Sequence, residues 1–145
     1  MKKAVLDASV ILKWYLSDEN DGEKALALLR QYISGDLDIL APTLLEFELV
    51  NGLILAQKRG RAGEEKVILA IEGFINLQIG FKSLYSIYSK VIHYCKAYSR
   101  SAYDASYLAL ADVEGLPLIT ADEGLYNSVR KDLKWVKWLG DIYPR

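Results

Sequence analysis

The chain has 145 residues, 52% of them hydrophobic and 26% charged, which predicts one folded domain over residues 1–145 and argues against disorder. Its net charge of -1 gives no overall attraction to nucleic acid or anionic lipid, so a polyanion would have to be held by a local patch or by metal ions. No apolar run approaches the roughly 18 residues of a membrane span. Asp7 and Lys13 also interrupt what would be the apolar region of a signal peptide. We therefore expect a cytoplasmic protein without a membrane segment.

The lone cysteine and the lone histidine limit the kinds of site that the chain can form. Cys95 has no partner for an intramolecular disulfide, and His93 alone argues against the usual His/Cys zinc site. A Ser-His-Asp or Cys-His nucleophile system would need His93, and no nucleophile-elbow pattern accompanies it. We interpret both residues as parts of a helix, one packed and one on its surface.

Short apolar runs alternate with helical patterns along the chain. The first run, 4–6, ends at Asp7 and is followed by a helical pattern to about Leu16, as in a buried strand that feeds a helix. Further strands are predicted at 37–41, 78–81, 116–120 and 135–139, the last at a sheet edge, and further helices up to Gly35, at 43–58, 64–77, 86–98, from 102 to Gly115, and at 123–130. This alternation predicts a three-layer α/β domain with a central, mostly parallel sheet of about five strands between helices.

The predicted helix at 43–58 is apolar on almost every side, which is typical of a buried helix. Glu48 lies inside it and would be costly to bury unless it is paired or binds a metal. Glu46 is two residues away, about 200° around the helix, so Glu46 and Glu48 cannot face the same site. Asn51 can share the face of Glu48, and only this favours Glu48 over Glu46.

Three further acids stand at the ends of predicted elements. Asp7 and Asp122 follow strands of the predicted parallel sheet, whose carboxyl ends share one edge where ligands bind. Asp104 opens a helix that can reach this edge if it runs antiparallel to the strands. Each has a structural alternative: Asp7 and Asp122 could cap the helices that follow them, and Ser101 with Asp104 approximates a capping box.

Convergence of Asp7, Glu48, Asp104 and Asp122 would create a site with a clear chemical preference. Burial and mutual repulsion would raise the pKa values of these acids unless cations neutralise them. Oxygen ligands without His or Cys suit Mg²⁺ or Mn²⁺. Such sites hold one or two ions and activate water for attack on a phosphodiester.

Four segments carry a resemblance to a known family. They are Val5-Leu6-Asp7-Ala8-Ser9, the pattern Ala41-Pro42-x5-Glu48-x2-Asn51-x-Leu53, the helix 102–111, and the run 115–122. In order and spacing the segments resemble the PIN-domain ribonucleases, and among them the VapC-like toxins of type II toxin–antitoxin pairs. The resemblance implies a PIN fold and a Mg²⁺- or Mn²⁺-dependent endoribonuclease acting on single-stranded or structured RNA.

By position, the resemblance matches Asp7, Glu48, Asp104 and Asp122 to the family's metal-binding, catalytic acids. It matches Ser9 to the hydroxyl residue that supports the first Asp, and it leaves out Glu46. Asn51, within the matched pattern, is expected to support Glu48. Ala8 stands where the family often has Thr, a mild departure because Ser9 is present.

The resemblance also implies partners, namely a small VapB-like antitoxin protein and a second copy in a homodimer. The apolar stretches 43–58 and 67–81 suit either a dimer surface or a core, and we favour the core. Candidate contacts for RNA are the basic groups Lys58-Arg59-Arg61, Lys96 with Arg100 and Arg130-Lys131 with Lys134, and the aromatics Trp14, Tyr15 and Tyr103.

Two other classes compete with the metal-dependent nuclease. Haloacid-dehalogenase phosphatases also place an Asp after the first strand, but they require a second Asp two residues later, where this chain has Ser9. The other class is a catalytically weak PIN-fold module that binds RNA or protein, for which a lost acid would be the expected mark. Metal-dependent cleavage abolished by one carboxylate change would separate the classes.

Overall fold

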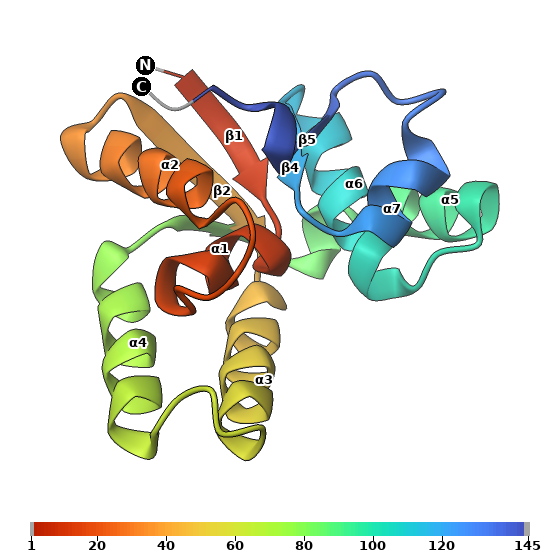
Figure 1. The fold of residues 1–145 in the computed structure, drawn as a ribbon. Coiled ribbons are helices and arrows are strands. Elements are labelled where there is room, and N and C mark those ends of the chain that lie inside the picture. The colour runs from red at the N-terminus through yellow and green to blue at the C-terminus, as the bar shows by residue number, and fades with distance from the viewer. Residues whose placement is uncertain (1, 144–145) are drawn as a thin grey trace.

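The computed structural model describes residues 2–143, and a five-stranded sheet forms their centre (Figure 1). The strands are β1 (Lys2–Leu6), β2 (Leu37–Pro42), β3 (Gly80–Lys82), β4 (Leu118–Thr120) and β5 (Val136–Trp138). They lie in the order β3-β2-β1-β4-β5, and neighbours pair in parallel throughout. The expected parallel sheet of five strands is confirmed, and β5 is an edge strand as predicted.

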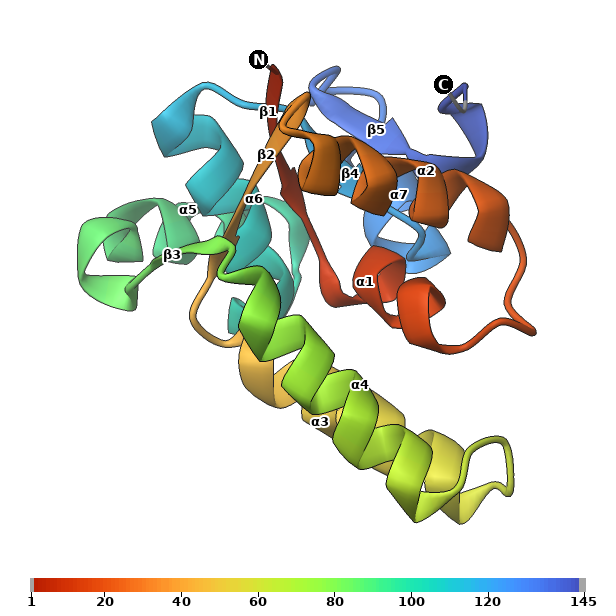
Figure 2. The ribbon, with the colours of Figure 1, turned by 90° about the vertical axis from the view of Figure 1, so that its left-hand side faces the viewer.

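Seven α-helices surround this sheet within residues 2–143. They are α1 (Ala8–Tyr15), α2 (Gly22–Ser34), α3 (Leu45–Lys58), α4 (Glu64–Leu77), α5 (Tyr88–Tyr98), α6 (Ala102–Glu114) and α7 (Glu123–Val129). Helices α1 and α2 cover one face and α5 and α6 the other, while α3 and α4 form a hairpin that extends past the sheet (Figure 2). The three-layer α/β prediction is therefore confirmed.

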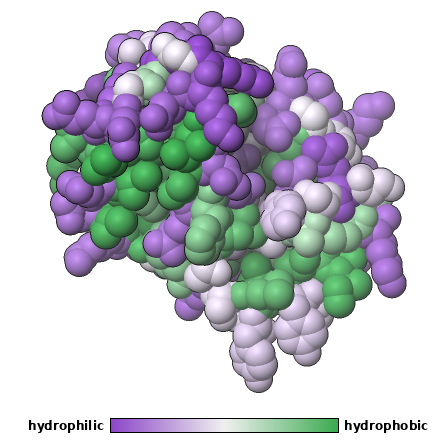
Figure 3. All heavy atoms as spheres, turned by 90° about the horizontal axis from the view of Figure 1, so that it is seen from below, coloured by the Kyte–Doolittle hydropathy of each residue, from purple (hydrophilic) through white to green (hydrophobic). Residues whose placement is uncertain are grey.

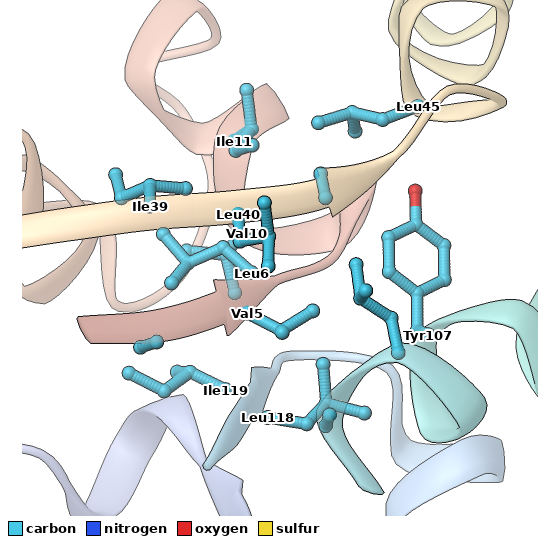
Figure 4. Packing of buried hydrophobic residues seen from close by; sticks show 14 of the residues in the cluster. Val5, Leu6, Val10, Ile11, Ile39, Leu40, Leu45, Tyr107, Leu118 and Ile119 are labelled. Carbon is cyan, nitrogen blue, oxygen red and sulfur yellow. The ribbon is translucent and has the colours of Figure 1, made fainter. Parts of the chain in front are cut away.

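The core lies where β1 passes through the middle of the sheet. Val5 and Leu6 are fully buried because β1 pairs with β2 on one side and β4 on the other. Side chains from α1 and from the adjoining strands close around them (Figure 4). Each large apolar side chain buried this way contributes about 1.5–3 kcal/mol. Gly52 lets α3 approach α1, since a side-chain carbon there would stand 2.6 Å from Leu12.

The prediction that the apolar helix at 43–58 is buried on all sides is wrong for one face of α3. Leu45, Leu49 and Leu53 are buried, whereas Phe47 is 75% exposed. The reason is the hairpin: α3 packs mainly against α1 and α4, and these two helices leave Phe47 and Leu55 exposed. Apolar side chains accordingly appear among polar ones on the surface at this end of the molecule (Figure 3). None of the helices in residues 2–143 has the length and apolar character needed to cross a membrane.

The chain connections single out one point on the sheet. From β1 the chain crosses through α1 and α2 to β2 on one side, and it later returns through α5 and α6 to β4 on the other side of β1. The carboxyl ends of β1 and β4 therefore flank a topological switch point, where open parallel sheets bind ligands. Asp7 directly follows β1, and Asp122 stands two residues after β4.

Candidate metal centre

Asp7 occupies the switch point as a buried carboxylate, 5% exposed. Its Oδ1 accepts hydrogen bonds from the Ser9 amide at 3.1 Å and the Ser9 hydroxyl at 2.5 Å, so Asp7 also caps α1. Its Oδ2 accepts a 2.5 Å hydrogen bond from the Thr120 hydroxyl. Burial raises the pKa of Asp7 from 3.8 to about 6, against the lowering effect of the Ser9 and Thr120 hydrogen bonds.

Two hydroxyls connect Asp7 to the loop that follows β4. The Ser9 hydroxyl accepts from the Ala121 amide at 2.8 Å, and the Thr120 hydroxyl accepts from the Asp122 amide at 3.0 Å. Ser9 therefore lies where it was expected, beside the first Asp. Thr120 was not predicted as a site residue. Its signal is register: Leu6 pairs with Ile119, so the next residues, Asp7 and Thr120, lie side by side.

Glu48 faces the same edge from the first turns of α3. Its Oε1 accepts a 2.5 Å hydrogen bond from the hydroxyl of Tyr107, a buried residue of α6. Figure 4 shows this hydroxyl pointing from α6 toward the end of β2, where α3 begins with Leu45. Burial raises the pKa of Glu48, as do the charges of Asp104 and Asp122. Burial and the Glu48 carboxylate hold the pKa of Tyr107 far above its ordinary value, so its hydroxyl stays a donor.

Asp104 lies in the first turn of α6 and is paired with Arg100. The Nε and Nη2 atoms of Arg100 donate to Oδ2 of Asp104 at 3.1 and 2.8 Å. The same guanidinium lies beside the start of α7: a side-chain carbon on Gly124 would stand 3.5 Å from Nη2 of Arg100 and 3.3 Å from Oδ1 of Asp122. Arg100, proposed from sequence as an RNA contact, thus lies between two of the acids.

The capping alternatives are also confirmed. The Asp122 carboxylate accepts from the Leu125 amide at 3.1 Å and caps α7, while the Ser101 hydroxyl accepts from the Asp104 amide at 3.2 Å. The capping box is only half formed, because the Asp104 carboxylate bonds to Arg100 instead. Capping uses single lone pairs of Asp7 and Asp122, so it leaves oxygen sites free for another ligand.

The four acids are close enough for charge repulsion between some of them to shift pKa values. The charge of Asp122 raises the pKa of Asp7, and those of Asp104 and Asp122 raise that of Glu48. Within residues 2–143, however, no three His, Cys, Asp or Glu side chains stand ready to hold a metal ion together. The donor set still fits Mg²⁺ or Mn²⁺: all donors are carboxylate oxygens, and one is buried at a cost that a cation would offset.

The other residues singled out from the sequence lie in varied settings. Asn51 is exposed one turn beyond Glu48, and Tyr103, beside Asp104, is 65% exposed. The prediction that Trp14 stacks on RNA bases is wrong, because Trp14 is buried and its indole N–H donates to the Ala25 carbonyl at 2.8 Å. Arg61 is bound to Asp18 and Glu19, with contacts of 2.8–3.0 Å.

A doubly wound parallel sheet with carboxylates gathered at its switch point defines the class: an α/β domain with an acidic site. The PIN domain family matches residues 4–131, and the chain belongs to this family. This confirms the family expected from the four sequence segments. A sequence comparison with curated proteins gives no significant match.

Solved structures share this fold at low sequence identity. PAE2754 from Pyrobaculum aerophilum superposes with a TM-score of 0.63 at 21% identity, covering 96% of this chain and 92% of its own. VapC20 of Mycobacterium tuberculosis, a sarcin-ricin loop cleaving toxin, gives 0.62 at 12% identity over 87% of this chain and 95% of its own. FitAcB from Neisseria gonorrhoeae superposes with a TM-score of 0.61 at 21% identity, covering 96% of this chain and 99% of its own. These likenesses establish a common fold.

Proposed function

We propose that the chain is an endoribonuclease that hydrolyses phosphodiester bonds of RNA with Mg²⁺ or Mn²⁺ as cofactor. The observation that carries the proposal is the buried Asp7 carboxylate, held by two hydroxyls at the switch point of the sheet, with Glu48, Asp104 and Asp122 nearby. Membership of the PIN domain family supports it, as does the shared fold with a toxin that cleaves the sarcin-ricin loop.

In this proposal Asp7, Glu48 and Asp104 hold the metal ion, directly or through water, and Asp122 helps to hold a second ion or orients the attacking water. When bound, the ion lowers the pKa of a water molecule and stabilises negative charge on the phosphate. Ser9 and Thr120 fix both oxygens of Asp7, and Tyr107 fixes one oxygen of Glu48. Carboxylates fixed in this way lose little further freedom when they bind a ligand.

Arg100 has a second role in the proposal. If Asp104 held a metal ion, Arg100 would lose this carboxylate as its partner, and its guanidinium would lie free beside the start of α7. A guanidinium in that position can bind a phosphate oxygen of the RNA through two N–H groups. Asn51 remains a supporting residue that could reach the site through water from the exposed side of α3.

We further propose a toxin role with a small VapB-like antitoxin and a homodimer. The support on the molecule is the hairpin α3–α4, on which Phe47, Leu55 and Leu69 are exposed. Exposed apolar side chains gathered on one projecting element favour burial against another protein. A cytoplasmic location follows from the proposed RNA substrate.

A non-catalytic interaction module is the second candidate, and one observation favours it. The carboxylates already have protein partners, including the Arg100 guanidinium on Asp104, and no three of them are arranged around a common point. In that case RNA or a partner protein would bind without being cut. Binding of Mn²⁺ followed by calorimetry distinguishes the candidates, because a module of this kind has no need of the ion.

The deciding experiment is cleavage of a panel of single-stranded and hairpin RNAs with Mg²⁺ or Mn²⁺. We expect the wild type to cut at least one RNA, and both EDTA and Asp104→Asn to stop it. Cutting that survives EDTA would refute the metal-dependent mechanism. A wild type that folds, binds no metal ion and cuts nothing would favour the interaction module.

A further inference from the structure

A pocket lies beside β5 and α7, the helix that begins directly after Asp122. Strand β5 pairs with β4 so that Trp138, the last residue of β5, stands opposite Thr120. Thr120 in turn binds Asp7, so one strand, β4, separates Trp138 from the buried carboxylate at the end of β1. Tyr126 reaches the same region from α7, one helical turn beyond Asp122, whose carbonyl accepts from the Tyr126 amide at 2.9 Å.

The space between α7 and β5 is hollow. One pocket of about 370 Å³ is lined by Tyr126, Arg130, Lys134, Lys137, Trp138 and Asp141, among others. A second hollow of about 300 Å³ shares four of these residues and continues to Glu123, the neighbour of Asp122. Volumes of this size are typical of small-ligand sites, which range from about 300 to 1,000 Å³. The two hollows together extend from β5 to Glu123, the first residue of α7.

The lining combines flat aromatic rings with a guanidinium. The rings of Tyr126 and Trp138 have centroids 5.4 Å apart at an angle of 40°, which leaves a wedge between them rather than a closed stack. The guanidinium carbon of Arg130 lies 5.2 Å from the centroid of the Tyr126 ring. Both rings are only partly buried. Aromatic rings and Arg planes are the surfaces on which unpaired bases stack.

Charges around the pocket are divided in a way that fits one nucleotide. Lys134 and Lys137 are exposed and place positive charge on the β5 side. Asp141 and Glu123 add two carboxylates to the lining, and Glu123 is the residue after Asp122. A carboxylate accepts hydrogen bonds from base amino groups and repels a phosphate. The pocket therefore suits a base inside it and phosphates over the lysines.

We propose that this pocket binds one unpaired nucleobase of the RNA, next to the phosphodiester that the acidic site cleaves. The inference rests on the proposed ribonuclease function and adds to it a binding subsite formed by Tyr126, Arg130 and Trp138. The base stacks on the aromatic wedge, with its flanking phosphates near Lys134 and Lys137. An RNA strand bound in this way runs past Asp122 to the metal-binding carboxylates.

Binding can be tested apart from catalysis. Fluorescence anisotropy in EDTA would measure the affinity of the full chain for fluorescein-labelled oligo(A), oligo(U) and oligo(C) of eight nucleotides. We expect Tyr126→Leu and Trp138→Leu each to weaken binding roughly 5- to 150-fold, the effect of losing one base–aromatic stack. Tyr85→Leu is the matched control, because Tyr85 is 86% exposed near β3, at the opposite edge of the sheet.

The conservative variant Trp138→Phe separates stacking from a merely structural role. It should retain most of the RNA affinity, since Phe also stacks, while the quenching of tryptophan fluorescence by bound RNA is lost. If Trp138→Leu does not fold, Arg130→Gln at an exposed position decides the question through the same loss of affinity.

Two outcomes would overturn the subsite. One is a wild type that binds none of the three oligonucleotides in EDTA. The other is unchanged affinity in Tyr126→Leu, Trp138→Leu and Arg130→Gln. If these three variants also cut RNA like the wild type while Asp104→Asn does not, the ribonuclease proposal stands and only the subsite fails. Conversely, stacking-dependent binding by a protein that never cuts RNA would support the subsite and refute the catalytic function.

Discussion

The two sides of the candidate metal centre hold their carboxylates in opposite ways. On the β1 side, Asp7 is buried and receives only uncharged donors, the amide of Ser9 and the hydroxyls of Ser9 and Thr120. On the α6 side, Asp104 is partly exposed and is neutralised by the Arg100 guanidinium. The first side therefore carries an uncompensated charge, while the second carries its own cation.

This difference shows what each side contributes to metal binding. A buried carboxylate with uncharged donors is preorganised, but its ionised form destabilises the folded protein. A bound cation would offset this unfavourable energy of the buried charge. A carboxylate paired with Arg must first exchange one cation for another. We expect substitutions on the β1 side to alter stability and geometry, and those on the α6 side to alter mainly the competition for the metal ion.

The largest expected effect is the loss of RNA cleavage when Glu48, the glutamate that joins the two sides, is changed. Glu48→Gln should lower RNA cleavage by at least about 100-fold, because loss of a direct ligand exceeds the 10- to 100-fold effect of losing a supporting residue. Glu46→Gln is a matched control, since Glu46 is exposed and lies on another face of the same helix. Initial rates of RNA cleavage measure both variants. Equal losses of cleavage rate in the two variants would show that Glu48 is not a specific part of the site.

Removing the hydroxyls around Asp7 should have the next largest effect. Thr120→Val leaves Oδ2 of Asp7 without its donor and the Asp122 amide without its acceptor, so cleavage should fall about 10- to 100-fold. Ser9→Ala should act similarly through Oδ1. Ser86→Ala, which removes a hydroxyl at the far edge of the sheet, controls for hydroxyl deletion. Wild-type rates in both site variants would show that Asp7 needs no orientation.

The importance of Thr120 also shows how far the sequence could predict this molecule. Periodicity was sufficient for the alternating elements, and the helix expected at 64–77 has those bounds in α4. The four acids could be proposed because they end strands or interrupt an apolar helix, although choosing Glu48 over Glu46 depended on family resemblance. Thr120 could not be singled out, because a β-branched residue is ordinary in a strand and its role depends on the register of β4 against β1.

The errors have physical causes of the same kind. The helix at 43–58 was expected to be buried because an apolar circumference normally implies neighbours on all sides, yet α3 projects in a hairpin. Arg100 was proposed together with Lys96 as a basic contact for RNA, and its ion pair with Asp104 was not predicted. Its spacing of four residues from Asp104 was the available signal for the pair that the structure contains.

The buried charge of Asp7 predicts a pH-dependent stability in the absence of metal. Its folded pKa of about 6 exceeds the ordinary 3.8, so its favourable contribution is complete below about pH 4 and is lost as the pH rises through 6. Between about pH 5 and pH 8 this group alone should lower the free energy of unfolding by roughly 1–1.5 kcal/mol. Urea unfolding in EDTA measures it.

The variant Asp7→Asn isolates this contribution, because Glu48 also has a raised pKa and adds a dependence of the same sign. The wild type should lose more stability than Asp7→Asn over this pH range. Excess Mn²⁺ should reduce the difference at high pH, since the ion binds the ionised carboxylate. Parallel curves for the two proteins would contradict the burial of an ionisable Asp7.

The smallest expected effect concerns the cation that Asp104 already has. Arg100→Met keeps the length of the side chain but removes the competing charge, so Mn²⁺ should bind more tightly, by at most about fivefold, because a partly exposed ion pair contributes up to about 1 kcal/mol. Titration calorimetry measures this change, with Arg61→Met as control for a guanidinium paired elsewhere. RNA cleavage should fall in the same variant, since the released guanidinium can no longer meet a phosphate. Tighter metal binding with weaker cleavage would separate the two roles of Arg100, whereas weaker metal binding would show that the guanidinium orients Asp104 for the ion instead of competing with it.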